Sequence, residues 1–171
     1  MKWNLLLVII LAMPGCTSVV RTSANSVHLS RGSSLLLPPY VSATANENAG
    51  IAVTELTGTA LQERGFRVHQ LETPDRLLVD PAAAPNISAY RAAALRDGSA
   101  YILLGTVHEY DFKTDLDGSP AVGVTIKFID PHTGAVISQG SSSKVGHFSS
   151  SLTSTAQGAV DDLLNQMIQT K

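Results

Sequence analysis

The chain has 171 residues, a formal net charge of −2 and a hydrophobic content of 44%. This length is sufficient for one domain with a substantial hydrophobic core and is too short for two domains of ordinary size. Nucleic-acid binding needs a basic stripe on the protein surface, so the charge balance argues against a nucleic-acid partner.

The first residues have the pattern of a secretory signal. One positive charge is followed by an apolar run from Leu5 to Met13, and a Pro-Gly pair stands directly before Cys16. As a helix this run would reach about 14 Å, roughly half of the hydrocarbon core of a bilayer, which is too short for a membrane span. We therefore predict a signal peptide over residues 1–15.

Cys16 is the only cysteine of the chain. A structural disulfide would need a second cysteine, a zinc site would need Cys or His at ligand spacing, and a catalytic thiol would need a folded pocket. The segment MPGC resembles a bacterial lipobox, in which a small residue precedes a cysteine that is lipidated and becomes the first mature residue. We interpret Cys16 as a lipid anchor, the alternative being an inert cysteine in an ordinary secretory signal. Thr17 follows it in place of Asp, which favours the outer membrane over the inner one.

The next part of the chain predicts a tether followed by a strand–helix–strand unit. Residues 16–33 are rich in Ser, Thr, Val, Asn and Arg without a period, and we expect a lipidated tether there. The run SLLLPPY at 34–40 predicts a buried strand that stops at its prolines. Apolar residues recur at roughly helical spacing over 47–65, where a glycine ends the helix, and 66–71 can return as a second strand.

A loop, a short helix and a hairpin are expected next. Residues 72–86 carry three prolines and predict a loop, and the Ala-rich segment 87–96 predicts a helix. A strongly apolar strand is expected over 100–107. The tight turn PHTG predicts that 121–130 and 135–145 form a hairpin. One apolar face of its first strand comprises Val122, Val124, Ile126 and Phe128.

A last helix is expected from residue 150 to 169, with Ser149 or Ser150 as its cap. Its apolar stripe comprises Leu152, Ala156, Ala159, Val160, Leu163, Leu164 and Met167. The early alternation of strands and helices favours parallel pairing, whereas the late hairpin is antiparallel. The sequence thus predicts one compact α/β domain over residues 34–171, with a mixed central sheet and helices packed on it.

The sequence contains none of the motifs GxGxxG, Walker loop, GxSxG or HExxH. The five histidines are scattered, and His108 and His132 are expected at a strand end and in a turn, not in a metal or acid–base site. No pattern of His and Asp accompanies the serines at 141–143 and 149–151, so strand and cap positions explain them. We expect no catalytic residue and no cofactor.

One group of residues is a candidate functional site because it concentrates acidic side chains. It is the segment EYDFKTDLDG at 109–118, which we expect on a strand end and the loop after it. Its acidic residues are Glu109, Asp111, Asp115 and Asp117. An EF-hand aligned on Gly118 would have Lys113 and Val124 at two ligand positions, so two calcium ligands are missing and we expect no metal site. The segment is either a solvated hairpin loop or an acidic patch that binds a cationic partner. In a ring-shaped oligomer, each subunit would contribute one such patch to a negatively charged rim.

Three segments within residues 100–168 carry a family resemblance: GTVHEY at 105–110, DGSPAVG at 117–123 and DPHTG at 130–134. With the striped last helix they resemble the PelC family, outer-membrane lipoproteins of Pel exopolysaccharide export. SLLLPPY is similar to the first strand of the wider group of CsgG-like and TolB-N-terminal-like periplasmic lipoproteins.

The resemblance implies a non-enzymatic lipoprotein that forms a homo-oligomeric ring on the periplasmic face of the outer membrane. It also implies a β-barrel porin above the ring as a partner, and an acidic interior that guides a cationic polysaccharide, which matches the acids at 109–117. The family carries a membrane-contacting tryptophan between the last strand and the last helix. The nearest aromatic here is Phe148, the candidate for that contact, because Trp3 lies in the signal peptide.

Ring assembly needs head-to-tail contacts, and the paired strands from 121 to 145 with the neighbouring sheet edge are the expected self-association surface. Two other functions stay open. Some lipoproteins of this superfamily activate a periplasmic enzyme such as a cell-wall synthase, and these would be monomeric. A curli-type secretion lipoprotein needs a long amphipathic insertion with membrane-crossing strands of about 9–11 residues, for which the compact hairpin leaves little room.

Overall fold

The computed structural model describes residues 18–23, 26–71, 86–114, 118–147 and 149–170. In chain order its elements are β1 (Ser18–Ser23), β2 (Val27–Leu29), β3 (Ser34–Leu37), β4 (Val41–Ser42), α1 (Ala49–Glu63), β5 (Arg67–Gln70), α2 (Ile87–Arg96), β6 (Tyr101–Lys113), β7 (Ser119–Ile129), β8 (Val136–Val145), α3 (Leu152–Met167) and β9 (Ile168–Thr170). Within these residues, no helix combines the length and the apolar character needed to cross a bilayer.

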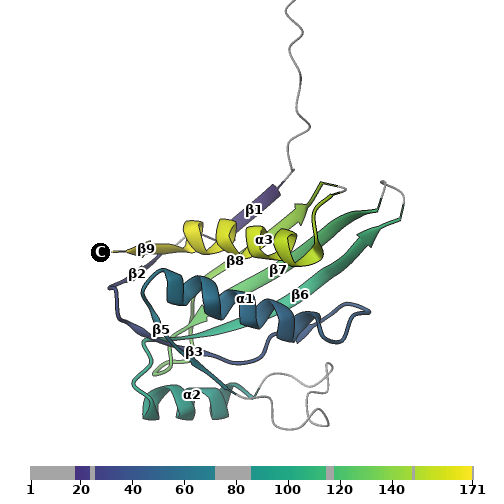
Figure 1. The fold of residues 1–171 in the computed structure, drawn as a ribbon. Helices are drawn as coiled ribbons and strands as arrows, with labels where there is room; N and C mark the ends of the chain where they lie inside the picture. Colours follow the sequence, from purple (N-terminus) through teal and green to yellow (C-terminus); the bar gives the residue numbers. More distant parts are fainter. Residues whose placement is uncertain (1–17, 24–25, 72–85, 115–117, 148, 171) are drawn as a thin grey trace, which may run out of the picture.

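A mixed β-sheet forms the centre of the fold (Figure 1). Its strand order is β1-β8-β7-β6-β3-β5, and the short β4 also pairs with β6. β3 is parallel to β5 and β6, whereas β6, β7 and β8 form an antiparallel meander to which β1 adds antiparallel. A separate parallel pair joins β2 to β9. The predicted α/β fold, with a mixed sheet and a late antiparallel hairpin, is confirmed.

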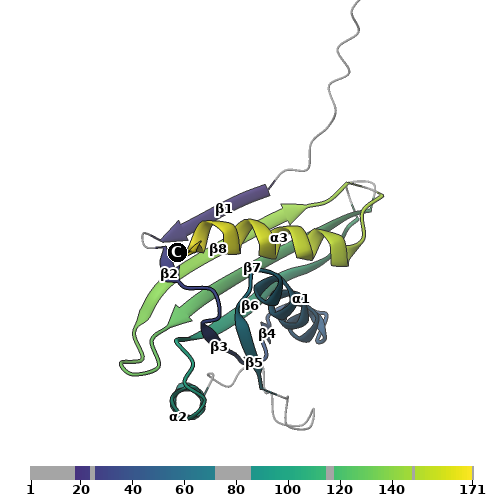
Figure 2. The same cartoon turned by 60° about the vertical axis from the view of Figure 1, so that its left-hand side comes forward.

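The two faces of the sheet are covered unequally. α1 and α3 lie side by side on one face, and α2 packs on the other face only near β3 and the start of β6 (Figure 2). Successive side chains of β3 point to opposite faces of the sheet. Leu35 and Leu37 therefore belong to the core under α1 and α3, whereas Leu36 packs with α2. The rest of the second face, over β6, β7 and β8, has no described helix above it.

The hairpin and the last helix follow the predicted patterns. Val122, Val124, Ile126 and Phe128 are all buried in the main core, as is the predicted α3 stripe apart from the half-buried Leu152. The helix cap differs from the expectation, because Ser151, not Ser149 or Ser150, begins α3. Its hydroxyl accepts a hydrogen bond from the Ser154 backbone nitrogen at 3.0 Å, and the Ser154 hydroxyl accepts one from the Ser151 nitrogen at 3.1 Å. Only Ser151 has a serine three positions ahead to complete this capping box.

The turn between β7 and β8 is held by one carboxylate. Oδ1 of Asp130 accepts hydrogen bonds from the backbone nitrogens of His132, at 2.7 Å, and Thr133, at 3.1 Å. The bonds from Thr133 and His132 hold the pKa of Asp130 below its ordinary value. Gly134 closes the turn with a φ of 77°, a left-handed conformation that favours glycine. The predicted tight turn is confirmed.

Two predicted boundaries are wrong in the structure. The segment expected to be a tether contains β1, which pairs with β8, and β2, which pairs with β9, so the fold includes strands that lie before residue 34. The strand expected over 100–107 extends to Lys113, because the antiparallel partner β7 supplies backbone hydrogen bonds beyond the apolar run. Glu109 and Asp111 therefore lie inside a strand.

Tyr40 occupies a slot between α1 and β6. Its ring is 3% exposed, and burial raises the pKa of its hydroxyl above the ordinary value. Two glycines form the slot: a Cβ on Gly50 would lie 2.1 Å from the Tyr40 carbonyl oxygen, and one on Gly105 would lie 2.3 Å from its ring. The Tyr40 backbone nitrogen donates a hydrogen bond to Thr54 Oγ1 at 2.8 Å, which ties the chain after β3 to α1.

Candidate functional site

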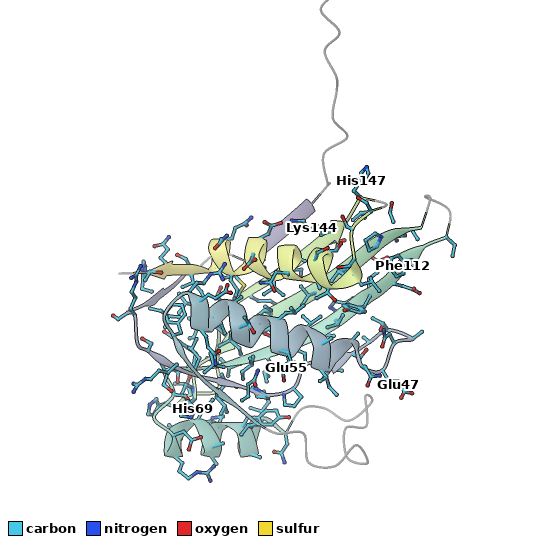
Figure 3. All side chains as sticks on the ribbon, viewed as in Figure 1. Glu47, Glu55, His69, Phe112, Lys144 and His147 are labelled. Carbon is cyan, nitrogen blue, oxygen red and sulfur yellow. The ribbon has the colours of Figure 1, made fainter. Side chains whose placement is uncertain are left out.

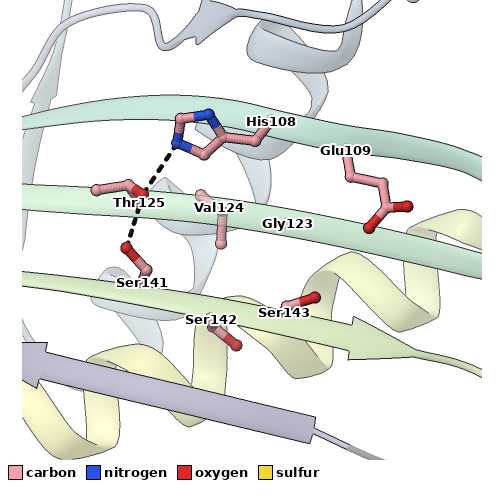
Figure 4. A pocket seen from close by; sticks show the side chains of 8 residues that line it. All are labelled: His108, Glu109, Gly123, Val124, Thr125, Ser141, Ser142 and Ser143. Carbon is pink, nitrogen blue, oxygen red and sulfur yellow. Dashed lines mark hydrogen bonds between the residues drawn. The ribbon is translucent and has the colours of Figure 1, made fainter.

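A bulge in β6 brings two polar side chains together on the uncovered face of the sheet. The register of β6 against β7 shifts between Val107 and Glu109, which leaves His108 as the extra residue. His108 and Glu109 both lie on the side away from α1 and α3, as Figure 4 shows. The strand then resumes its alternation, which places Asp111 on the same side as Glu109.

An open groove of about 590 Å³ crosses β6, β7 and β8 on this face. We call it the polar groove, and it is lined by His108, Glu109, Gly123, Val124, Thr125, Ser141, Ser142 and Ser143. His108 Nε2 lies 3.0 Å from Thr125 Oγ1, which in turn lies 2.8 Å from Ser141 Oγ (Figure 4). This row of one imidazole and two hydroxyls offers hydrogen-bond donors and acceptors across three strands. The groove can therefore bind polar groups of another molecule.

The acidic residues of β6 flank the polar groove. Glu109 Oε1 lies 2.5 Å from Lys113 Nζ, and both side chains are about one-third exposed, so this ion pair contributes little to stability. Asp111 Oδ1 accepts a hydrogen bond from the Phe112 backbone nitrogen at 2.8 Å. Glu109 and Asp111 thus form the start of an acidic stripe on the uncovered face.

Several predicted site residues lie outside the described part of the chain. These are the lipidation candidate Cys16, the acids Asp115 and Asp117, and the membrane-contact candidate Phe148. Of the four predicted acids, the structure brings Glu109 and Asp111 together on one strand. Within the described residues, no group of three His, Cys, Asp or Glu side chains could hold a metal ion.

The hydroxyl row was not predicted as a site. His108 lies on the surface, as expected, but it lies inside β6 and not at a strand end, and its partner Thr125 was not singled out. The sequence held one signal for this row: Thr125 is a polar residue between the apolar Val124 and Ile126, and Ser141 is a polar residue of the next strand. Because the bulge sets which of these side chains meet, the periodicity of the sequence alone did not bring them together.

Comparisons with known proteins give a clear structural match. No family model and no curated protein matches the sequence. Among solved structures, a variant of the PelC dodecamer from Paraburkholderia phytofirmans is 25% identical, covers 91% of this chain and 100% of its own, and has a TM-score of 0.73. The chain has a PelC-like fold.

Two further structures agree with this assignment. A second crystal form of the P. phytofirmans PelC dodecamer is 24% identical, covers 90% of this chain and 99% of its own, and has a TM-score of 0.72. Lipoprotein GNA1162 from Neisseria meningitidis shares the fold at 19% identity and a TM-score of 0.55, covering 78% of this chain and 96% of its own. The resemblance to PelC read from the sequence is confirmed.

Proposed function

We propose that this protein is a lipid-anchored, ring-forming component of a Pel-type exopolysaccharide export apparatus, and that it acts without catalysis. The observation that carries the proposal is the match to the complete chain of PelC, whose solved structures are dodecamers. Cys16 attaches the chain to the periplasmic face of the outer membrane, beneath a β-barrel porin. The ring then lies in the path of the exported polymer.

The uncovered sheet face suits assembly of this kind. A ring needs two different surfaces on each subunit that bind head to tail. The polar groove offers hydrogen-bonding groups over three strands, and Val136 and Ile137 add exposed apolar area on the same hairpin, at 51% and 37% exposure. Such a mixture of polar and apolar area is typical of protein–protein interfaces. We assign the part of this face over β7 and β8 to the contact between neighbouring subunits, which leaves the acidic residues of β6 beside it to face the lumen.

The acidic stripe suits a cationic polymer. On one subunit, Glu109 is partly neutralised by Lys113, so the stripe has little effect alone. In a ring the charges of Asp111, Asp115 and Asp117 recur in each subunit, and walls of lower dielectric focus their field on the lumen. A partly deacetylated amino-sugar polymer would then be held by many weak contacts, each soft enough to permit passage.

The size of the extracted protein tests assembly. We expect the detergent-solubilised, lipidated protein to sediment as a particle many times larger than the 18.0 kDa chain. Ser143→Arg, which places a long charged side chain on the exposed side of β8, should weaken assembly about tenfold or more, because this side chain occupies space between the subunits and its charge must be desolvated at the contact. Thr59→Arg on the exposed side of α1 is the control and should assemble normally. A wild-type particle near the mass of one chain would favour the enzyme-activator function.

A charge-removal variant tests the polymer path. Asp111→Asn combined with Asp115→Asn and Asp117→Asn should lower polymer export about tenfold, since focused charge raises encounter rates by at least that factor. The matched control removes the same number of charges from exposed acids of the α1 region: Glu47→Gln, Glu55→Gln and Glu63→Gln. Normal export by the first variant, or equal loss in both, would show that the stripe is only a solvated hairpin.

A further inference from the structure

An imidazole and a carboxylate stand next to each other on the uncovered face because of the bulge in β6. Val107 points into the core, so strict alternation would place His108 on the uncovered face and return Glu109 to the core side. The shift of register at this point lets both His108 and Glu109 point away from α1 and α3 (Figure 4). A histidine is thereby held at the beginning of the acidic stripe.

The hydroxyl row is compatible with either charge state of this histidine. His108 is exposed, and its Nε2 lies 3.0 Å from Thr125 Oγ1. Because a hydroxyl can donate or accept a hydrogen bond, Thr125 can donate to an unprotonated ring nitrogen and accept from a protonated one. Ser141 Oγ, 2.8 Å from Thr125 Oγ1, can adjust in the same way. Protonation of the imidazole therefore costs the row none of its hydrogen bonds.

Protonation of His108 would remove the net charge of the described part of the stripe. Glu109 and Asp111 carry two negative charges, and Lys113, which is paired with Glu109, carries one positive charge, which leaves a net charge of −1. One additional positive charge on His108 brings this sum to zero. In a ring the same change occurs in every subunit, so the field that is focused on the lumen falls with it.

Two further charged residues belong to the elements beside β6. Lys127 of β7 lies on the same face, two residues beyond Thr125. Glu47 follows β4 on the other side of β6, at the end of the molecule that carries His147 (Figure 3). The residues that β8 presents on the uncovered face beside Thr125 are uncharged: Gln139, Ser141 and Ser143. Of the titratable groups named on this face, His108 is the one of a type whose charge ordinarily changes between about pH 5 and about pH 8.

We infer that His108 regulates the acidic stripe: below neutral pH its imidazolium neutralises the stripe and weakens the binding of a cationic polymer by the ring. The inference rests on the proposed function, in which the stripe faces the lumen. As the pH falls, a histidine gains a positive charge while aspartate and glutamate side chains ordinarily stay ionised. The stripe therefore loses negative charge through His108, and a cation is attracted less strongly.

A polymer with a permanent charge tests this regulation. Rhodamine-labelled poly(diallyldimethylammonium) carries quaternary ammonium groups, so its own charge does not change with pH. We expect its affinity for the detergent-solubilised, lipidated wild-type protein to fall about threefold or more between about pH 7.5 and about pH 5.5 at low ionic strength. Fluorescence anisotropy measures the binding, and sedimentation at both pH values checks that the protein particle keeps its size.

Three variants separate His108 from other groups. His108→Gln is neutral at both pH values and can still form a hydrogen bond with Thr125, so it should bind the polymer equally at both. His108→Lys is positively charged at both pH values and should bind weakly at both. His147→Gln removes an exposed histidine from the same end of the molecule but outside the polar groove, and it should keep the pH dependence of the wild type.

Equal wild-type affinity at the two pH values, or a pH dependence that persists in His108→Gln, would overturn the inference. A particle that dissociates at the lower pH would overturn it as well, because the pH would then act on assembly and not on the stripe. Wild-type protein that does not bind the polymer at the higher pH would instead contradict the polymer path proposed above, and the inference with it.

Discussion

Gly50→Ala is expected to lower the free energy of unfolding by about 3 kcal/mol, which is a large share of the stability of a small domain. A Cβ at this position would stand 2.1 Å from the Tyr40 carbonyl oxygen and 3.1 Å from the Ser42 backbone nitrogen. Backbone atoms cannot rotate aside as a side chain can, and the buried Tyr40 ring holds this part of the chain in place. The first turn of α1 must therefore move away from the sheet. Urea unfolding followed by circular dichroism measures the loss.

Gly58→Ala is the matched control in the same helix. A Cβ there would approach Gln70 Nε2 at 2.5 Å, but this atom is the far end of an exposed side chain and can move away. Alanine also favours the helix over glycine by up to about 1 kcal/mol, so the net change should stay within about 1 kcal/mol of zero. Equal losses in the two variants would show that the close approach of Gly50 to Tyr40 does not decide the packing of α1.

Phe128→Ala is expected to cost about 3–5 kcal/mol, the range for removal of a buried aromatic side chain. Phe128 is 0% exposed, and its ring lies 6.0 Å from that of Tyr101 at an interplanar angle of 84°, an edge-to-face contact. Removal leaves a cavity beneath α1 and α3 and takes away this contact. The midpoint of thermal unfolding should fall by about 10 °C.

Phe112→Ala makes the same chemical change on the neighbouring strand at a side chain that is 46% exposed. Its stability in solution should stay within about 1 kcal/mol of the wild type, since half of the ring is already in water. A loss as large as that of Phe128→Ala would mean that Phe112 is packed in the core of the assembled protein. The pair of variants thus separates a buried aromatic side chain that stabilises the fold from an exposed one that does not.

The strongly periodic parts of the sequence predicted the fold well. The alternation of Val122, Val124, Ile126 and Phe128 identified the buried face of β7, and the α3 stripe identified the helix above it. Both signals arise from burial on one side of an element, which leaves a regular trace in the sequence. The antiparallel hairpin followed from its turn residues for an equally local reason.

The parts that were missed depend on pairing and not on burial. The sequence of β1 has no alternation of apolar and polar residues that would predict a strand. Backbone hydrogen bonds to the serine-rich β8 hold it in the sheet. The charged end of β6 is a strand because β7 continues beside it, although its residues alone predict a loop. The polar groove depends on the shift of register at His108, which no periodicity in the sequence encodes. The acids of β6 were recognised by composition. Strand alternation places Glu109 and Asp111 on a common face, and the same shift decides which face of the sheet that is.

The parallel pairing of β2 with β9 has a kinetic consequence. It joins Val27 to Ile168, near the two ends of the described chain, and both side chains belong to the main core. Bringing such distant residues together requires closure of a loop that contains almost the whole domain, and the entropic cost of that closure comes before any contact compensates for it. Topologies dominated by such non-local contacts fold slowly. A chain that is synthesised from its N-terminus must therefore wait for its last residues before the core can close, and during that interval Val27 and Leu29 remain exposed to other unfolded chains.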